Sequence, residues 1–176
     1  MKSRLITIIV LLNLISPSSA QTVETLAVAT DLLSKQKYVE AARILDSLAK
    51  SGNAEAQYRL GLLHYNGKGV AESEKTAISL LTSSAQQGNV DAMYQLGNVL
   101  TFGTEAFRLV SEPDIEAAKW YFKAAKLGNA DAQYSLGLLF MAGKGLEKNE
   151  KEALYWMRQA ANKGHKDASS YVAGRK

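Results

Sequence analysis

The chain has 176 residues, a formal net charge of +4 and no cysteine. The absence of cysteine excludes a disulfide framework and any metal site built on thiolates, and the length suits one domain with a substantial core. Basic and acidic residues are interspersed along the chain, which indicates a solvated helical surface and argues against a nucleic-acid-binding protein.

The chain begins with the pattern of a secretory signal peptide. Lys2 and Arg4 give a positive start, an apolar run covers residues 5–15, and Ser18-Ser19-Ala20 forms a small-residue cleavage signature. The apolar run is too short to span a bilayer comfortably. We therefore expect cleavage after Ala20 and a periplasmic or secreted mature protein without a stable membrane span. The alternative is an uncleaved N-terminal anchor.

Two stretches that suit helices follow the signal. Residues 23–36 fit one helix and residues 38–49 fit a second, so residues 21–52 predict a helical hairpin.

A stretch of ten residues then occurs three times in similar form. It reads Gly-Asn-Ala-Glu-Ala-Gln-Tyr-Arg-Leu-Gly over residues 52–61, and related copies occupy residues 88–97 and 128–137. Gly164 and His165 start a further copy, so successive copies begin 36, 40 and 36 residues apart. An active site is made once, whereas every unit of a stack needs the same contact with its neighbour. The repetition therefore indicates stacked structural units.

Each unit predicts two helices joined by a turn. Apolar residues recur at helical spacing in both halves of the unit. Ser73 and Asn149 suit the N-cap of the second helix, and Glu152 is placed to complete a capping box with Asn149. A glycine such as Gly88 suits the left-handed C-cap after the second helix.

Each predicted first helix contains one glycine. Glycine destabilises a helix interior by about 1 kcal/mol relative to alanine, so its recurrence suggests a close approach by the second helix. The glycines and the small residues expected against them are Gly61 with Ala77, Gly97 with Ala117, and Gly137 with Ala153.

The motif Ala-x-x-x-Leu-Gly, then Gly-x-Gly-Val, then Ala-x-x-Trp-x-x-x-Ala-Ala-x-x-Gly resembles the Sel1-like repeat, a relative of the tetratricopeptide repeat. The resemblance implies an all-α fold, a right-handed superhelical solenoid of antiparallel helical hairpins. The expected organisation is a signal peptide (1–20), an N-terminal tetratricopeptide-like cap (21–52), three repeats within residues 53–165 (53–88, 89–128 and 129–164) and a truncated fourth repeat or C-terminal cap (166–176).

No pattern in the sequence indicates an enzyme, a metal site or a cofactor. His64 and His165 are the only histidines, and they form no helical His-x-x-x-His pair. The Gly-Lys-Gly turns at 67–69 and 143–145 lack the Ser/Thr and the preceding strand of a phosphate-binding loop. We expect a non-enzymatic protein that needs no cofactor and no metal.

A row of tyrosines, one in each repeat, is the first candidate binding surface. Tyr58, Tyr94 and Tyr134 each stand two residues before a leucine of the buried face. In tetratricopeptide-like stacks the corresponding position faces the concave groove, so the resemblance implies a binding row there. The same helices contribute Leu62, Asn98, Leu138 and Met141 to this candidate groove. The alternative is partial burial of the tyrosines between neighbouring first helices.

The second candidate surface is an insertion in the middle repeat. Residues 104–109 occupy a place where the other copies have Lys-Gly, and the flanking anchors are kept, so we expect a bulge that leaves the stack in register. Phe107, Arg108 and Leu109 are side chains of an interface type in this loop. The alternative is that Phe107 folds back onto its own helices.

The resemblance implies a protein-interaction scaffold or adaptor. We expect an exported protein that binds another protein or an extended peptide in its concave groove, in cell-envelope assembly, signalling or motility. The alternative is a binder of envelope glycan, or of another non-protein ligand, that stacks on the tyrosine row. We expect no nucleic-acid partner.

Overall fold

The computed structural model describes residues 19–175, and within them the chain consists of helices and connecting loops. The predicted signal peptide falls mainly on residues 1–18, which lie outside the described residues. The helices are α2 (Ser19–Ser34), α3 (Tyr38–Lys50), α4 (Ala54–Tyr65), α5 (Glu74–Gln86), α6 (Val90–Phe102), α7 (Ala106–Leu109), α8 (Pro113–Lys126), α9 (Ala130–Ala142), α10 (Glu150–Asn162) and α11 (Lys166–Ala173).

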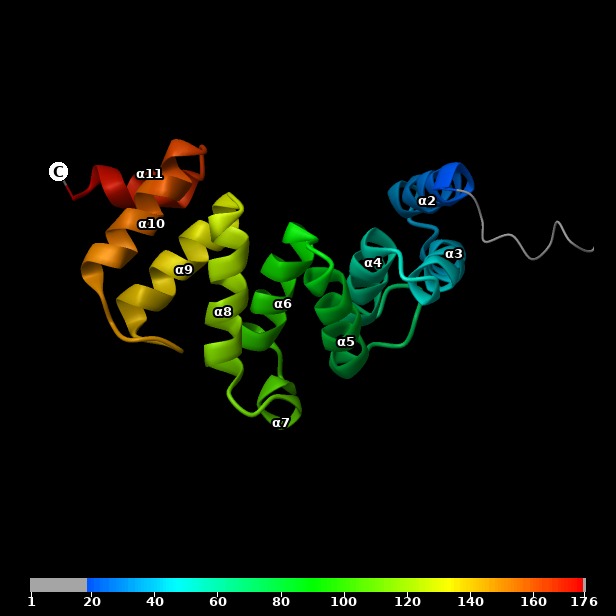
Figure 1. Ribbon diagram of the computed structural model, residues 1–176, viewed down its shortest axis with the longest axis horizontal. Helices are drawn as coiled ribbons and strands as arrows, with labels where there is room; N and C mark the ends of the chain where they lie inside the picture. The colour runs from blue at the N-terminus through cyan, green and yellow to red at the C-terminus, as the bar shows by residue number, and fades with distance from the viewer. Residues whose placement is uncertain (1–18, 176) are drawn as a thin grey trace, which may run out of the picture.

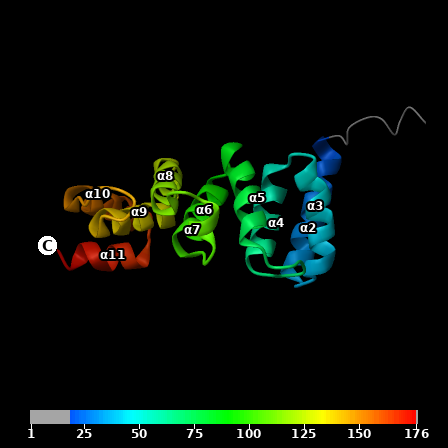
Figure 2. The same ribbon diagram turned by 90° about the horizontal axis from the view of Figure 1, so that it is seen from below.

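The long helices form an elongated stack of hairpins whose ends lie far apart (Figure 1 and Figure 2). The pairs α2–α3, α4–α5, α6–α8 and α9–α10 pack against each other, and each pair packs on the next. The expected all-α solenoid of antiparallel helical hairpins is confirmed. Within the described part of the chain, no helix is both long and apolar enough to cross a membrane.

The ten-residue motif builds the junction between one hairpin and the next. Its glycine follows the second helix in a left-handed conformation, with φ of +93° at Gly88, which residues other than glycine rarely adopt. The asparagine after it is the N-cap of the next first helix. Its Oδ1 accepts from the backbone N–H three residues on, at 2.8 Å in all three copies: Asn53 with Ala56, Asn89 with Ala92 and Asn129 with Ala132.

The N-caps of the second helices are Ser73 and Asn149, as predicted. Asn149 Oδ1 accepts from the backbone N–H of Lys151 and of Glu152, each at 3.1 Å. The predicted capping box is wrong, because the backbone N–H of Asn149 donates to the Phe140 carbonyl at 2.9 Å. That bond ties the start of α10 to the end of α9 and takes the N–H that Glu152 would accept in a capping box.

The glycines of the first helices do allow a close approach. At Gly137 the predicted Ala153 takes part through its carbonyl oxygen, 3.2 Å from where a Cβ would be, but the nearest atoms at all three glycines belong to other residues. A Cβ at Gly97 would lie 2.6 Å from the Tyr121 ring, and one at Gly137 would lie 3.0 Å from the Met157 side chain. At Gly61 the nearest side chain is Leu81. These partners stand one helical turn beyond the predicted alanines, so the helices cross nearer the C-terminal end of the second helix.

The middle of the core is built around Tyr121, which is 1% exposed. Its hydroxyl donates to Asn98 Oδ1 at 2.7 Å, and its ring centroid lies 6.0 Å from that of Tyr94. Burial raises the pKa of Tyr121 to about 12. The corresponding core positions in the other copies hold the apolar Leu81 and Met157, so among these three equivalent positions only that of the middle hairpin carries a polar group.

The insertion forms the short helix α7 at the edge of the stack, beside α6 and α8 (Figure 1). The Glu74 carboxylate, on α5, accepts from the backbone N–H of Thr104 at 2.7 Å and from that of Glu105 at 2.8 Å. Ala106 is 2% exposed and packs inward, whereas Phe107 is 65% exposed. The alternative in which Phe107 folds back onto its helices is therefore wrong.

Candidate functional site

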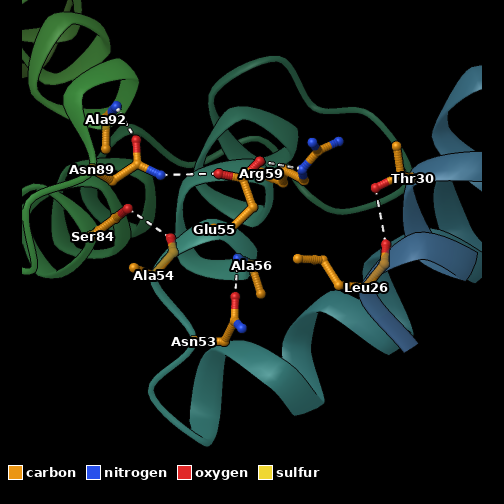
Figure 3. A network of polar contacts seen from close by, with 10 residues as sticks. All are labelled: Leu26, Thr30, Asn53, Ala54, Glu55, Ala56, Arg59, Ser84, Asn89 and Ala92. Carbon is orange, nitrogen blue, oxygen red and sulfur yellow. Dashed lines mark hydrogen bonds and ion pairs between the residues drawn. The ribbon is translucent and has the colours of Figure 1, made fainter. Parts of the chain in front are cut away.

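A ladder of polar contacts joins the first helix of each repeat to the start of the next. The Asn89 amide donates to Glu55 Oε2 at 3.0 Å, and Arg59 holds the other oxygen of that carboxylate at 2.6 Å (Figure 3). One repeat later, the Asn129 amide lies 3.5 Å from Asp91 Oδ1. The ladder runs along the face formed by the first helices and lines it with carboxylates.

A cavity of about 470 Å³ opens on this face at its N-terminal end. Helix α4 supplies most of its lining, and α2, α3, the turn after α4 and α6 supply the rest. The lining residues are Leu33, Tyr38, Glu55, Tyr58, Arg59, Leu62, Leu63, Asn66, Lys68 and Asp91. Apolar walls thus stand beside two acidic and two basic side chains, an arrangement that suits a ligand with both apolar and charged groups.

Tyr58 and Leu62 are the two predicted groove residues that line this cavity. Tyr58 is half-buried, and burial raises the pKa of its hydroxyl, with Asp91 and Glu55 adding to the rise. The phenol is therefore neutral at physiological pH and can both donate and accept a hydrogen bond. The two residues lie one turn apart on α4, so both can contact a ligand that occupies this cavity.

Tyr94 and Asn98 lie in the middle repeat and interact within the protein. Tyr94 is half-buried against the core beside Tyr121. The side-chain oxygen of Asn98 accepts a hydrogen bond from the Tyr121 hydroxyl. The Asn98 amide also lies 3.3 Å from Gln95 Oε1. Both side chains have structural partners, and neither lines the cavity around Tyr58.

The third repeat places its predicted residues in another contact between units. The Tyr134 ring stacks on His165 with centroids 4.3 Å apart, and Met141 packs in the same apolar cluster at the C-terminal end. Leu138 is 38% exposed. The predicted tyrosine row is therefore three half-buried rings in three different surroundings, of which Tyr58 alone lines the α4 cavity.

The insertion presents a second exposed surface. Phe107 and Leu109 are 65% and 39% exposed, and the guanidinium of Arg108 lies 5.4 Å from the centroid of the Phe107 ring. Phe102, at the end of α6, is 73% exposed. Four large side chains thus stand in solvent at one edge of the middle repeat.

Sequence reasoning missed the charged lining of the cavity. Glu55 and Asp91 belong to the ten-residue motif, whose fourth position is acidic in every copy. The signal is visible in the sequence, but an acid in the first turn of a helix is equally explained by its stabilisation of the helix N-terminus. In the structure the same acid also binds the asparagine of the next copy.

Within the described residues, no group of three or more histidine, aspartate or glutamate side chains could hold a metal ion. His64 Nδ1 lies 3.0 Å from the Ala71 carbonyl, and His165 caps α11 by accepting from the Ala168 N–H. Each histidine thus has a structural partner.

The family model described as "Sel1 repeat" matches residues 54–89, 90–129 and 130–165, which is more than half of the chain. The chain belongs to the Sel1 repeat family. Sel1 repeats generally mediate protein–protein interactions, and Sel1 repeat proteins are typically non-catalytic scaffolds. No curated protein matches the chain.

Solved structures of Sel1 repeat proteins are similar to this one. A Sel1 repeat protein from Oxalobacter formigenes is 34% identical with a TM-score of 0.74, and the match covers 83% of this chain and 58% of that one. The protective antigen c5321 of uropathogenic Escherichia coli is 32% identical with a TM-score of 0.74, covering 86% and 32%.

Helicobacter pylori cysteine rich protein B shares the fold at 23% identity and a TM-score of 0.54, and the match covers 82% of this chain and 96% of that one. This Sel1 repeat chain spans 58% of the length of the Oxalobacter formigenes protein and 32% of that of c5321.

Proposed function

We propose that this Sel1 repeat protein is an exported, non-enzymatic scaffold that binds a protein or an extended peptide segment on its first-helix face, within the cell envelope. The observation that carries the proposal is the cavity around Tyr58 and Leu62. An extended peptide presents apolar side chains and backbone amides together, and the cavity offers apolar walls beside side chains of both charges. The signal-like pattern of residues 1–20 supports export.

The test compares two leucines at the same position of the repeat. Leu62 lines the cavity, whereas Leu138 occupies the corresponding place in the third repeat and is 38% exposed outside it. We expect Leu62→Ser to lose most of the partner captured from an envelope extract while its melting temperature stays near that of the parent. Leu138→Ser is the matched control and should retain the partner. Equal loss in both variants would contradict the assignment of the cavity.

The same proteins test the alternative ligand class, an envelope glycan. Sedimentation with purified cell wall measures glycan binding without any protein partner. If the parent sediments with cell wall and Leu62→Ser does not, while no protein is captured in either case, the ligand is a glycan and the scaffold proposal is wrong.

The exposed insertion is the second candidate contact surface. Replacing residues 104–109 with Lys-Gly is no clean test, because it removes the backbone donors of Glu74 and leaves that carboxylate unpaired. Phe107→Ser with Leu109→Ser leaves the Glu74 contacts intact and changes only side chains that are 65% and 39% exposed. Partner loss at an unchanged melting temperature would assign the contact to the insertion, and full binding would exclude it.

A further inference from the structure

A groove with apolar walls runs along the start of α8, beside the turn between α9 and α10. Two cavities of about 470 Å³ and 310 Å³ open there, and they adjoin because both are lined by Ile115, Gly145 and Leu146. Pro113 lines the first cavity and Phe122 lines the second. We call this surface the α8 groove. It shares no residue with the α4 cavity.

The turn that forms one wall of the α8 groove is fixed to α8. Gly145 has a φ of +71°, and a Cβ there would overlap the Asp114 carbonyl, so glycine lets the turn lie this close. Lys144 Nζ lies 3.1 Å from Asp114 Oδ1 and ties the two segments together. Leu146 is half-buried and packs against the core. The groove is therefore preformed.

The insertion holds apolar side chains out in solvent. The Glu74 carboxylate accepts from the backbone N–H groups of Thr104 and Glu105, so the loop is fixed to α5. Phe107 and Leu109 are nevertheless exposed. A fixed loop loses little conformational freedom when it binds, and large apolar side chains in solvent mark interaction surfaces. The insertion thus has the character of a preorganised contact group.

The insertion and the α8 groove lie at the same edge of the stack. Helix α7 and the turn before α10 both lie at the lower edge in Figure 1, on either side of the start of α8. Because the insertion is fixed on its own side of α8, its side chains can enter the groove of a second copy but not their own. A two-fold rotation places each insertion over the groove of the other copy, so the contact forms twice and the assembly closes.

The two surfaces carry unpaired charges of opposite sign. Arg108 stands between the two exposed apolar residues of the insertion and forms no ion pair with a described residue. Glu112 lines the groove, and its carboxylate has no partner within residues 19–175. The other charged residues of the groove, Asp114 and Lys119, already have ion-pair partners. The charges that remain are complementary between the insertion and the groove.

We propose that this protein forms a two-fold symmetric dimer in which the insertion of each copy enters the α8 groove of the other. Phe107 and Leu109 contact the apolar walls, and Arg108 of one copy pairs with Glu112 of the other. The dimer uses no residue of the α4 cavity, so it stands whether or not that cavity binds a partner.

The test measures self-association of the purified protein. Sedimentation velocity over a range of concentrations gives the dissociation constant with no other protein present. We expect a monomer–dimer equilibrium in which Phe107→Ser with Leu109→Ser raises the dissociation constant at least about tenfold, because two large apolar side chains leave the contact. Phe122→Ser, in the wall of the groove, should also weaken the dimer. Leu127→Ser is the matched control, since Leu127 is 60% exposed at the other end of α8.

An exchange of charges identifies which surfaces meet. Arg108→Glu and Glu112→Arg should each weaken the dimer about tenfold, because each places like charges together in two symmetric contacts. The double variant, Arg108→Glu with Glu112→Arg, restores opposite charges between the copies and should dimerise like the parent. Both residues are exposed, so the melting temperature of these variants should stay near that of the parent.

Three results would overturn the proposal. A protein that stays monomeric up to about 1 mM would mean that the two surfaces do not meet. Assemblies larger than a dimer would mean that the contact is not reciprocal. A double charge variant that dimerises no better than the single variants would place Arg108 and Glu112 apart. Leu62→Ser should dimerise like the parent, so a failure of the α4 cavity and a failure of the dimer are distinguishable.

Discussion

Gly97→Ala tests the packing of the middle hairpin most directly. A Cβ at Gly97 would lie 2.6 Å and 2.7 Å from Cε1 and Cδ1 of Tyr121, about 1 Å inside the usual carbon–carbon contact distance. The ring has little room to move, because it is 1% exposed and its hydroxyl is bonded to Asn98. Overpacking of this kind costs about 1–3 kcal/mol, whereas alanine gains about 1 kcal/mol over glycine in a helix interior.

We therefore expect Gly97→Ala to lower the free energy of unfolding by about 1–2 kcal/mol, taking the upper part of the overpacking range because the neighbour is a rigid ring. Gly137→Ala is the matched control, since its Cβ would meet the flexible Met157 side chain at 3.0 Å and the Ala153 carbonyl oxygen at 3.2 Å, both farther than the Tyr121 ring is from Gly97. That variant should change stability by less than about 1 kcal/mol because the helix propensity offsets the strain. Urea unfolding followed by circular dichroism measures both.

A double-mutant cycle identifies the cause of the loss. Tyr121→Leu places the residue of the first repeat, Leu81, at the same position, so Gly97→Ala should cost less in that background, with a coupling energy of about 1 kcal/mol. The reasoning is refuted if Gly97→Ala is as stable as the parent, or if its cost is unchanged by Tyr121→Leu.

Three further predictions concern polar groups. Burial pushes the pKa of Glu74 up, but the bonds from Glu105 and Thr104 outweigh burial and hold the pKa below its ordinary value of 4.5. Glu74 therefore stabilises the fold above about pH 4.5 and loses that effect as pH falls through the lower folded-state pKa. The difference in melting temperature between the parent and Glu74→Gln should shrink on acidification, and a difference independent of pH would contradict this. Burial raises the pKa of Tyr121 to about 12, so the stability that this group adds to the folded state is complete below its unfolded-state pKa of about 10 and is lost as pH rises towards 12. Tyr121→Phe should remove this alkaline loss in thermal melts. An unchanged alkaline profile would count against the reasoning. Asn89→Ala should cost about 0.5–1 kcal/mol more than Asn53→Ala in urea unfolding, because both lose a cap but Asn89 also donates to Glu55; equal costs would mean that the ladder contributes no stability.

The repeat made much of the fold predictable from the sequence. Caps such as Asn53 and Ser73 are local signals, and their register fixed where each helix begins. The partner of each helix glycine was harder to predict, because alignment gives the register of two helices but not the height at which they cross. Tyr121 rather than Ala117 meets Gly97 for that reason.

The sites were less predictable than the fold. Tyr58 and Tyr134 share one place in the alignment, yet the first lines a cavity and the second stacks on His165, since each ring's surroundings come from the neighbouring repeat. The unpaired Oε1 of Gln133 is invisible in the sequence, because Lys163 stands where Gln87 donates to Gln57 in the first repeat, and its Nζ lies beside Gly128.

The arrangement of the hairpins has a mechanical consequence. Within residues 19–175 the extensive contacts join helices that are neighbours along the stack, and none of them joins the first hairpin to the last. A small rotation between two adjacent hairpins is carried undiminished to every hairpin beyond it, and the bend of the whole molecule is the sum of these rotations. A ligand that fixes one such angle changes the reach of the molecule from end to end. An occupant of the cavity at α4 that fixed such an angle would thus move the far hairpins without contacting them.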